Sequence, residues 1–409
     1  MIKVAFFLAN ERIADVDCSD VVSGNPGVGG SEHQIILISS LLAARNNNLS
    51  VCLYVEKEGR FPKGLDVVCV NSIQDAFFDA SKRGYDRFVF DKKNVAWNEK
   101  PFCDYQTNMK IYPWCHNICG KEEQDFWAGH PLLGRIVCVG REQADLYRYR
   151  KAFLCSDYIY NCVPLNQDKV NKVKKKQYKR NHNVVYVGSL VPAKCFHVLA
   201  SVWKDVVAAI PDAQLFVIGS GNLYDRNARL GDYGIAEESY EKEFMPHLLE
   251  DGTLMPSVHF LGRMGREKDD VLLKMKLGIP NPLGVTETFC LSAVEMQMMG
   301  CSVAAMDCFA YYDTFVNGKI SKNRKAFVKD IVSLLTKDDA VGYDFVVKKL
   351  RKFDIGPVMN DWERLLNNNQ KDAFCHPLWP LHNCFVKHKW AKELLRLLAR
   401  PFPIVYKVL

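Results

Sequence analysis

The chain has 409 residues, of which 48% are hydrophobic and 25% charged, and its formal net charge is +7. This length suggests two or three domains, and the apolar content excludes a chain that is disordered throughout. The mild positive charge suits a protein that handles anionic phosphates or lies at an anionic membrane. The charge does not argue for nucleic acid. The sequence has no apolar stretch of about 18 residues, so no transmembrane helix is predicted.

The first part of the chain alternates strand-like and helix-like segments. A buried strand is expected at residues 4–9, a glycine-rich loop at 24–30 and a helix at 31–44. Strands separated by helices form parallel sheets, so residues 1–165 are predicted to form an α/β domain. Its further strands are expected at 49–55, 65–70, 87–90, 109–112 and 135–139.

Residues 166–183 differ from this pattern, because they are rich in Lys and Arg and nearly free of apolar side chains. They are predicted to form a basic linker. A solvated connector is one interpretation, and a segment that faces a membrane or phosphates is the other. The basic residues are Lys169, Lys172, Lys174, Lys175, Lys176, Lys179 and Arg180.

A second alternating block follows and predicts another α/β domain over residues 184–355. Helices are expected at 196–210 and at 291–299, the latter ended by Gly300. Residues 356–409 are predicted to be helical. Within them, 390–399 is amphipathic and basic, as in a helix packed on a domain or one lying on anionic lipid. The strands of this block are expected at 184–187, 214–218, 258–261, 276–280 and 302–305.

The 15 cysteines are scattered, and no CxxC pair occurs. The closest spacings, such as Cys115 with Cys119, lack the partner cluster that a zinc site needs. Cys52, Cys138 and Cys290 lie in apolar runs, where a thiol behaves as a small hydrophobe. We therefore expect reduced, buried cysteines in a cytosolic protein.

Two glycine-containing segments follow predicted strands, at the edge where α/β sheets bind ligands. Gly29 and Gly30 open a helix, whose N–H groups favour a phosphate, although a turn that needs glycine for its geometry is the alternative. Lys194, six residues after Gly188, is placed to neutralise a leaving diphosphate. A surface lysine is the alternative there.

The third segment contains Glu287 and Glu295, one in a predicted loop and one in an apolar helix. Eight helical residues span roughly 12 Å. This is comparable with the span from a sugar, across a diphosphate, to a ribose. A carboxylate on a buried helix also needs a partner. The helix N-terminus between the two carboxylates suits a phosphate.

This segment resembles the E-x7-E motif of retaining glycosyltransferases of family 4. Other segments of residues 1–370 are also similar to motifs of that family and occur in the order that the family has them. These segments are 29–32, the strand ending at His116, 136–140, 160–164, 188–194, 215–221, 258–262 and 300–304. The resemblance implies the α/β fold called GT-B, in which two Rossmann-like domains face a central cleft. Residues 1–165 would bind the acceptor and 184–355 the nucleotide sugar, and helices in 356–409 would pack back on the first domain.

The resemblance also implies a role for each residue of the motifs. Glu295 would bind the ribose hydroxyls, Glu287 the donor sugar near its reacting carbon, and Lys194 the leaving diphosphate. His116 would line the acceptor side and contact the donor sugar. The other donor contacts would come from Gly29, Gly30, Gly188, Ser189, Arg263, Thr288, Phe289, Cys290 and Leu291.

Three positions depart from the family pattern. Ser189 stands where an arginine is usual, and Cys195 and Thr288 stand where glycines are usual. Either Arg263 or Arg266 replaces the missing cation, or the activity is low. The second case includes a non-catalytic member of the family.

The resemblance thus implies a metal-independent, cofactor-free, retaining transfer from a UDP- or GDP-linked sugar to a hydroxyl of a saccharide. The basic segments favour a lipid-linked acceptor, as in bacterial lipopolysaccharide and other surface polysaccharides. They also favour a cytoplasmic protein at the inner face of the membrane, with no nucleic-acid partner. A weak or inactive nucleotide-sugar-binding protein and a nucleotide-sugar epimerase remain alternatives. A nicotinamide oxidoreductase is disfavoured, because the glycine spacing of a dinucleotide fingerprint is broken.

Overall fold

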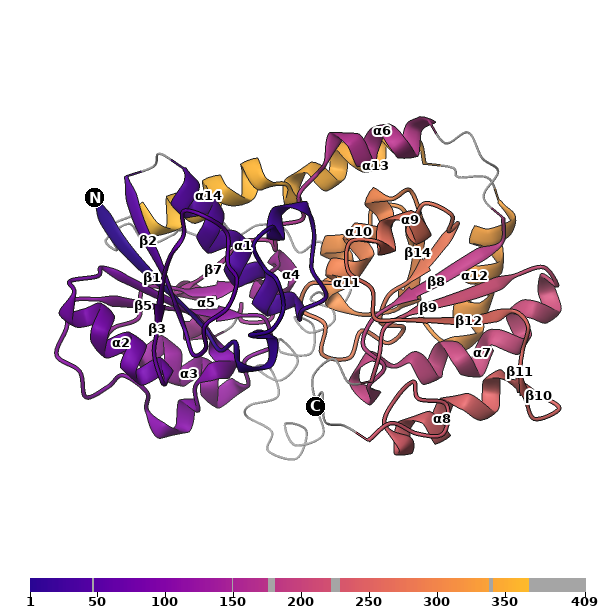
Figure 1. Cartoon of the computed structure of the whole chain (residues 1–409), viewed down its shortest axis with the longest axis horizontal. Helices are drawn as coiled ribbons and strands as arrows, with labels where there is room; N and C mark the ends of the chain where they lie inside the picture. The colour runs from indigo at the N-terminus through magenta and orange to yellow at the C-terminus, as the bar shows by residue number, and fades with distance from the viewer. Residues whose placement is uncertain (46–47, 149, 176–180, 222–228, 338–340, 368–409) are drawn as a thin grey trace, which may run out of the picture.

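The computed structural model describes the chain except residues 46–47, 149, 176–180, 222–228, 338–340 and 368–409 (Figure 1). Its N-terminal half forms a seven-stranded sheet in the order β3-β2-β1-β4-β5-β6-β7. All neighbouring strands are parallel. The strands are β1 Ile2–Leu8, β2 Leu49–Val55, β3 Asp66–Cys69, β4 Arg87–Asp91, β5 Lys110–Cys115, β6 Ile136–Cys138 and β7 Ser156–Tyr158.

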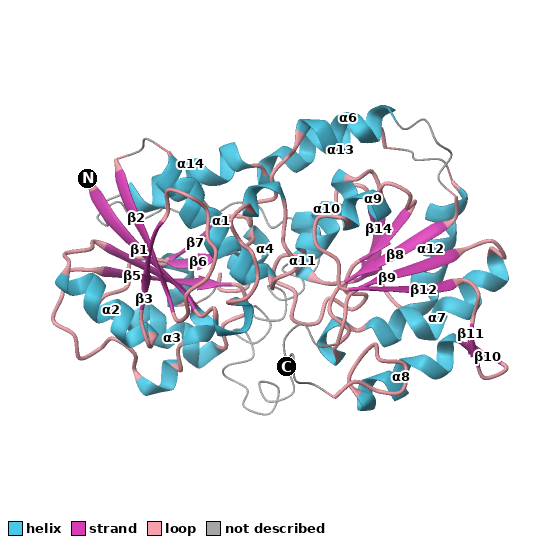
Figure 2. Ribbon diagram, viewed as in Figure 1, coloured by secondary structure: helices cyan, strands magenta, loops and turns pink. Residues whose placement is uncertain are grey.

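Helices cover both faces of this sheet (Figure 2), because its strands are apolar on both sides. Val4, Phe6 and Leu8 of β1 point into one core, and Ala5 and Phe7 into the other. The covering helices are α1 Gly30–Ala44, α2 Ile73–Lys82, α3 Lys121–Gly129, α4 Arg141–Asp145 and α5 Lys151–Leu154.

The C-terminal half forms a six-stranded parallel sheet in the order β12-β9-β8-β13-β14-β15. Its strands are β8 Asn183–Val187, β9 Gln214–Ile218, β12 Val258–Gly262, β13 Leu277–Ile279, β14 Ser302–Met306 and β15 Gly318–Ser321, and β10 Leu249–Glu250 pairs with β11 Thr253–Leu254 in a separate hairpin. Its helices are α7 Phe196–Ala209, α8 Glu238–Leu248, α9 Lys268–Leu272, α10 Leu291–Met298, α11 Phe309–Thr314, α12 Arg324–Thr336 and α13 Tyr343–Leu350. Short 3₁₀ helices are η1 Glu11–Ile13, η2 Val21–Ser23, η3 Lys92–Asn94, η4 Trp97–Glu99, η5 Pro192–Lys194 and η6 Arg351–Phe353.

The prediction of two parallel α/β sheets is confirmed, with corrections at particular segments. β7, β15 and the β10–β11 hairpin were not predicted. The first half of the expected linker is a helix, α6 Gln167–Lys175. Val170 and Val173, three positions apart, are buried on one side of it, and this spacing suffices for a packed helix even in a basic sequence. The amphipathic stretch at 390–399 lies outside the described residues.

The last described helix, α14 Ile355–Asn367, returns to the N-terminal sheet. Figure 1 shows it in yellow beside the indigo elements of that sheet. The Trp362 ring lies 6.0 Å from Phe6 and 4.7 Å from Trp114, between ring centroids. Arg45, the residue that follows α1, pairs with Glu363 of α14 at 3.1 Å. The chain therefore crosses between the two sheets twice.

In the described ranges, no helix is both long and apolar enough to cross a bilayer.

Trp362→Ala should destabilise the N-terminal half, because Trp362 is fully buried between Phe6 and Trp114. Removing a buried tryptophan side chain costs about 3–5 kcal/mol of unfolding free energy. Chemical denaturation followed by near-UV circular dichroism measures it. The control is Phe345→Ala in α13, whose side chain is 50% exposed. Equal losses in the two variants would contradict the packing role of Trp362.

Candidate active site

Two adjoining cavities lie between the two sheets. The first, of about 270 Å³, extends from the start of α1 and the end of β8 to α9 and α10. The second, of about 750 Å³, lies toward the ends of β4 and β5 and contains His116 and Lys93. The residues that line both cavities are Gly30, Lys194, Glu287, Phe289 and Leu291.

Lys194 and Glu287 form an ion pair where the two cavities meet. The distance from Lys194 Nζ to Glu287 Oε1 is 2.6 Å, and the Glu287 side chain is only 10% exposed. Thr286, just before Glu287, has a left-handed backbone with φ of 64°. Such a conformation in a β-branched residue costs on the order of 1–3 kcal/mol, and strain of this kind clusters at functional sites.

Lys194 ends the 3₁₀ helix η5, and the next residue carries the turn into α7. Cys195 has φ of 54°, the left-handed conformation that glycine adopts most readily. Cys195 thus has a backbone conformation that suits glycine, the residue that the resemblance implies at this position. The turn presents Lys194 to the cleft even though the side chain differs.

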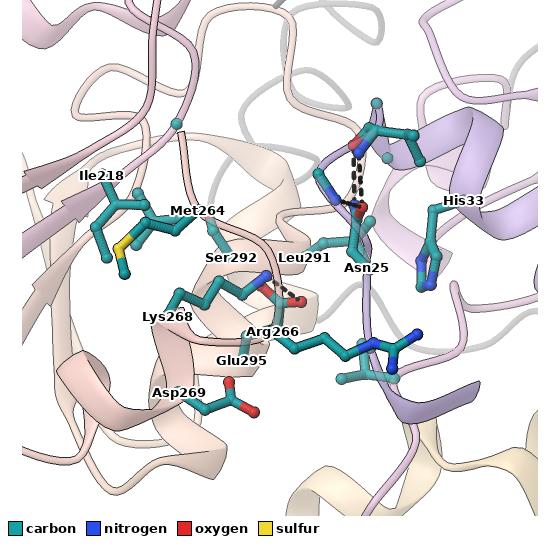
Figure 3. Close-up of a pocket in the computed structure, with 18 of the residues that line it drawn as sticks. Asn25, His33, Ile218, Met264, Arg266, Lys268, Asp269, Leu291, Ser292 and Glu295 are labelled. Carbon is teal, nitrogen blue, oxygen red and sulfur yellow. Dashed lines mark hydrogen bonds and ion pairs between the residues drawn. The ribbon is translucent and has the colours of Figure 1, made fainter. Parts of the chain in front are cut away.

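Glu295 has a partner that the sequence did not reveal. Lys268 Nζ of α9 lies 3.1 Å from Glu295 Oε1 and 3.0 Å from Oε2, so it bridges both carboxylate oxygens. Figure 3 shows this pair on one wall of the cavity, with Asn25 and His33 on the opposite wall. Because Lys268 is separated from Glu295 in the chain and lies in a mixed-charge run, no sequence signal singles it out.

The two candidate arginines differ in their surroundings. Arg266 Nη1 pairs with Asp20 Oδ2 at 2.8 Å and therefore joins the two halves of the cleft. Arg263 also lines the first cavity and forms no ion pair with any described residue. Ser189 lines the cavity too, but its hydroxyl donates to the Ser220 carbonyl at 3.1 Å. Arg263 is thus the better placed of the two to receive an anion.

Gly29 and Gly30 bring the N-terminus of α1 against that of α10. A Cβ at Gly30 would lie 3.0 Å from Leu291 Cδ1, so a larger residue there would require the Leu291 side chain to shift. The positive ends of two helix dipoles therefore lie near the boundary of the two cavities. Both helix ends suit the binding of phosphate oxygens.

The segment from Thr288 to Leu291 belongs to the C-terminal half and contacts the N-terminal half. Thr288 Oγ1 donates to the His116 carbonyl at 2.5 Å, a contact that the usual glycine would lack. Phe289 and Leu291 line both cavities, and Gly188 lines the first. The Cys290 side chain is buried among Ala293, Phe309 and Tyr311 and faces away from the cavities, so only its backbone could contact a ligand there.

His116 follows β5 and lines the second cavity together with Thr288 and Glu287. Its ring packs on Trp114, with 4.4 Å between the ring centroids. Trp114 in turn packs on Trp362 of α14. Helix α14 therefore supports the position of His116 through two packed aromatic side chains, Trp362 and Trp114.

A further contact between the halves joins α4 to α11, outside both cavities. The Glu142 backbone N–H and the Tyr160 hydroxyl each donate to the Asp313 carboxylate at 2.9 Å. Burial, followed by the charges of Asp313 and Asp145, raises the pKa of Glu142 to about 8. Burial also raises the pKa of Asp313. Two carboxyl groups with raised pKa values therefore lie close together at this contact.

Part of the chain, its C-terminal half, matches a known family by sequence. Residues 167–344 match the model of the family described as "Glycosyl transferases group 1". The matched segment runs from α6 into α13 and includes Lys194, Lys268, Glu287 and Glu295. No curated protein matches the chain by sequence.

Solved structures with similar folds include glycosyltransferases. HepE of Anabaena, in complex with UDP and glucose, is 15% identical with a TM-score of 0.62, over 90% of this chain and 99% of that one. The lipopolysaccharide outer core galactosyltransferase WaaB is 13% identical with a TM-score of 0.57, over 89% and 99%. TarM of S. aureus, in a complex that contains UDP, is 17% identical with a TM-score of 0.55, over 72% and 59%. The fold is GT-B, as the sequence analysis predicted.

Glu142→Gln should stabilise the protein at high pH and not at low pH. The pKa of Glu142 is about 8 in the folded protein against an ordinary value of 4.5. Between these values the folded state binds a proton that the unfolded state releases, so native stability falls as pH rises through this window. Glutamine removes this dependence.

The melting temperature of the variant should exceed that of the native protein at pH 9, and the gap should close by pH 5. Glu122→Gln, at an exposed position in α3, is the matched control. A gap that is the same at both pH values would contradict the assignment.

Proposed function

We propose that the chain transfers a sugar from a nucleotide diphosphate sugar to a hydroxyl of a second saccharide. The observation that carries this proposal is the Lys194–Glu287 ion pair at the junction of two cavities. A transferase must place the donor and the acceptor on either side of one reacting carbon. This junction is the place where such a carbon would lie.

The first cavity is assigned to the donor. Glu295 would accept hydrogen bonds from the ribose, and Glu287 from the sugar. The diphosphate between them would lie against Lys194, Arg263 and the N-termini of α1 and α10. These groups are placed to stabilise the charge that develops on the leaving group, so the proposed transfer needs no metal or cofactor.

The proposed transfer retains the configuration of the sugar. Glu287 is engaged by Lys194 Nζ and, at 3.4 Å, by Asn281 Nδ2, which suits a hydrogen-bonding role better than a nucleophilic one. The bond from the reacting carbon to the phosphate oxygen breaks, and the acceptor oxygen bonds to that carbon on the same face. The acceptor's proton passes to the departing phosphate oxygen.

We infer that the donor is UDP-linked and that the protein belongs to family 4. HepE was solved with UDP-glucose and TarM with UDP, which supports this base over GDP. WaaB is a lipopolysaccharide galactosyltransferase, which supports an acceptor in surface-polysaccharide assembly. A lipid-linked acceptor at the inner face of the membrane completes the proposal and is supported by the basic residues of 166–183.

A non-catalytic nucleotide-sugar-binding protein is the second candidate. It is favoured by Ser189, whose hydroxyl is engaged by Ser220 and which supplies no positive charge to a diphosphate. Such a protein would bind the donor and release no product. Measuring donor binding and product release on the same sample separates the two candidates.

UDP should raise the melting temperature, because a ligand bound only by the folded state stabilises it by about 2.7 kcal/mol at 100 times its Kd. Glu295→Gln should lose most of this shift, since the carboxylate would be the ribose contact. GDP and NAD are the comparison ligands. A shift with NAD and none with UDP would contradict the proposed donor.

Lys194→Ala should lower kcat by roughly 10²–10³, by analogy with removal of one group that stabilises a developing anion. Released UDP and glycoside product measure the rate. Lys204→Ala is the matched control, because Lys204 is exposed on α7 and lines neither cavity. A near-native rate for Lys194→Ala, at unchanged folding, would remove Lys194 from the mechanism.

A further inference from the structure

Asp91 is a fully buried carboxylate beside the second cavity that the proposed transfer does not use. It is the last residue of β4, which pairs with β5, and His116 directly follows β5. Its Oδ2 lies 3.5 Å from His116 Nδ1 and 3.5 Å from Lys93 Nζ, and its side chain has no exposed surface. A buried charge is costly unless charged or hydrogen-bonding groups surround it.

The two oxygens of Asp91 have different tasks. Oδ1 accepts the backbone N–H of Lys93 at 3.1 Å, where Asp91 caps η3. Oδ2 accepts no hydrogen bond of good geometry from any described residue and faces the imidazole and the ammonium group. The backbone bond therefore fixes which oxygen faces His116.

His116 is held with one ring nitrogen toward Asp91. Its side chain is 7% exposed and packs on Trp114, and it lines the second cavity. Neither ring nitrogen has a hydrogen-bond partner in the described part of the chain. With Nδ1 directed to Asp91, Nε2 is a buried nitrogen without a partner among the described residues, in a side chain that lines the second cavity.

Lys93 keeps Asp91 charged. Its ammonium group also contacts Glu32 Oε1 at 3.0 Å and Ser31 Oγ at 2.7 Å, so the cation is itself held in place. Burial alone would raise the pKa of Asp91, but His116 and the Lys93 charge outweigh it and hold the pKa below its ordinary value. An ionised carboxylate only accepts hydrogen bonds, so it favours a hydrogen on the facing nitrogen.

We propose that Asp91 is a positioning residue that fixes His116 in the tautomer with hydrogen on Nδ1, so that the Nε2 lone pair accepts a sugar hydroxyl in the second cavity. The partner of one ring nitrogen sets the state of the other. The role in sugar transfer rests on the proposed function above. The tautomer itself does not, and it can be measured without any substrate.

Asp91→Asn tests the proposal with almost no change in volume. The backbone N–H of Lys93 needs an acceptor, so the asparagine oxygen takes the place of Oδ1 and the NH₂ group faces His116 Nδ1. Nδ1 must then accept, and the hydrogen moves to Nε2. The hydroxyl-accepting lone pair is lost from the cavity side.

The first measurement is ¹⁵N NMR of the full chain labelled at its 10 histidines, at pH 8.5, with His116→Gln to assign the His116 ring. The native ring should carry hydrogen on Nδ1, and the Asp91→Asn ring on Nε2. A native ring protonated on Nε2, or on both nitrogens, overturns the proposal without any Asp91 variant. An unchanged tautomer in folded Asp91→Asn overturns it as well.

The second measurement is steady-state kinetics with UDP-sugar. Asp91→Asn should lower kcat about 10- to 100-fold, the effect of leaving a buried polar group without its partner, at a nearly unchanged KM for the donor. Asp79→Asn is the matched control. Asp79 lies on α2, accepts a hydrogen bond from the Tyr54 hydroxyl, pairs with Arg83 and lines neither cavity. An unchanged kcat in Asp91→Asn overturns the role in transfer.

The two readouts separate the two proposals. If the tautomer shifts as expected but the native protein transfers no sugar, the Asp91–His116 assignment stands and the transferase proposal falls. If the native protein transfers sugar and the tautomer does not shift, the reverse holds.

Discussion

The ion pair between Lys194 and Glu287 is the interaction around which the cleft is organised. Each partner is placed by an unusual backbone segment: Lys194 by the left-handed Cys195 that follows it, and Glu287 by the left-handed Thr286 that precedes it. These two strained residues, Cys195 and Thr286, are stable only if the surrounding structure over-determines their conformation. The two backbone segments therefore place the charges of Lys194 and Glu287 at the junction of the cavities.

The two carboxylates of the C-terminal half follow one rule. Each faces the cleft from a largely buried position, and each is balanced by a lysine, Lys194 for Glu287 and Lys268 for Glu295. Because the Lys268 ammonium bridges both Glu295 oxygens, a ribose has to share or displace it. The carboxylates are thus prepared for hydroxyl groups but do not stand as bare buried charges.

Structural support for the acceptor side comes from the far end of the described chain. Trp362 of α14 packs on Trp114, Trp114 on His116, and Asp91 approaches His116 from the neighbouring strand. Thr288 reaches His116 from the C-terminal half. The position of one ring therefore depends on both sheets and on the returning helix, which makes it sensitive to how the halves are arranged.

Most of the elements of the two sheets were predictable from the sequence, and so was the class of chemistry that we propose. Apolar runs and their periods predicted most strands and the helices α1, α7 and α10 to within a few residues, but not α2, α8 or α12. The spacing of Glu287 and Glu295 pointed to a donor with two separated hydroxyl-bearing ends. It missed the short edge strands, because three or four residues carry too little pattern, and it missed α6, because two buried valines were outnumbered by lysines. Which charges are paired follows from the tertiary packing. Lys268 with Glu295, Asp20 with Arg266 and Asp91 with His116 are brought together by packing between elements far apart in the chain, and no local pattern records such a distance.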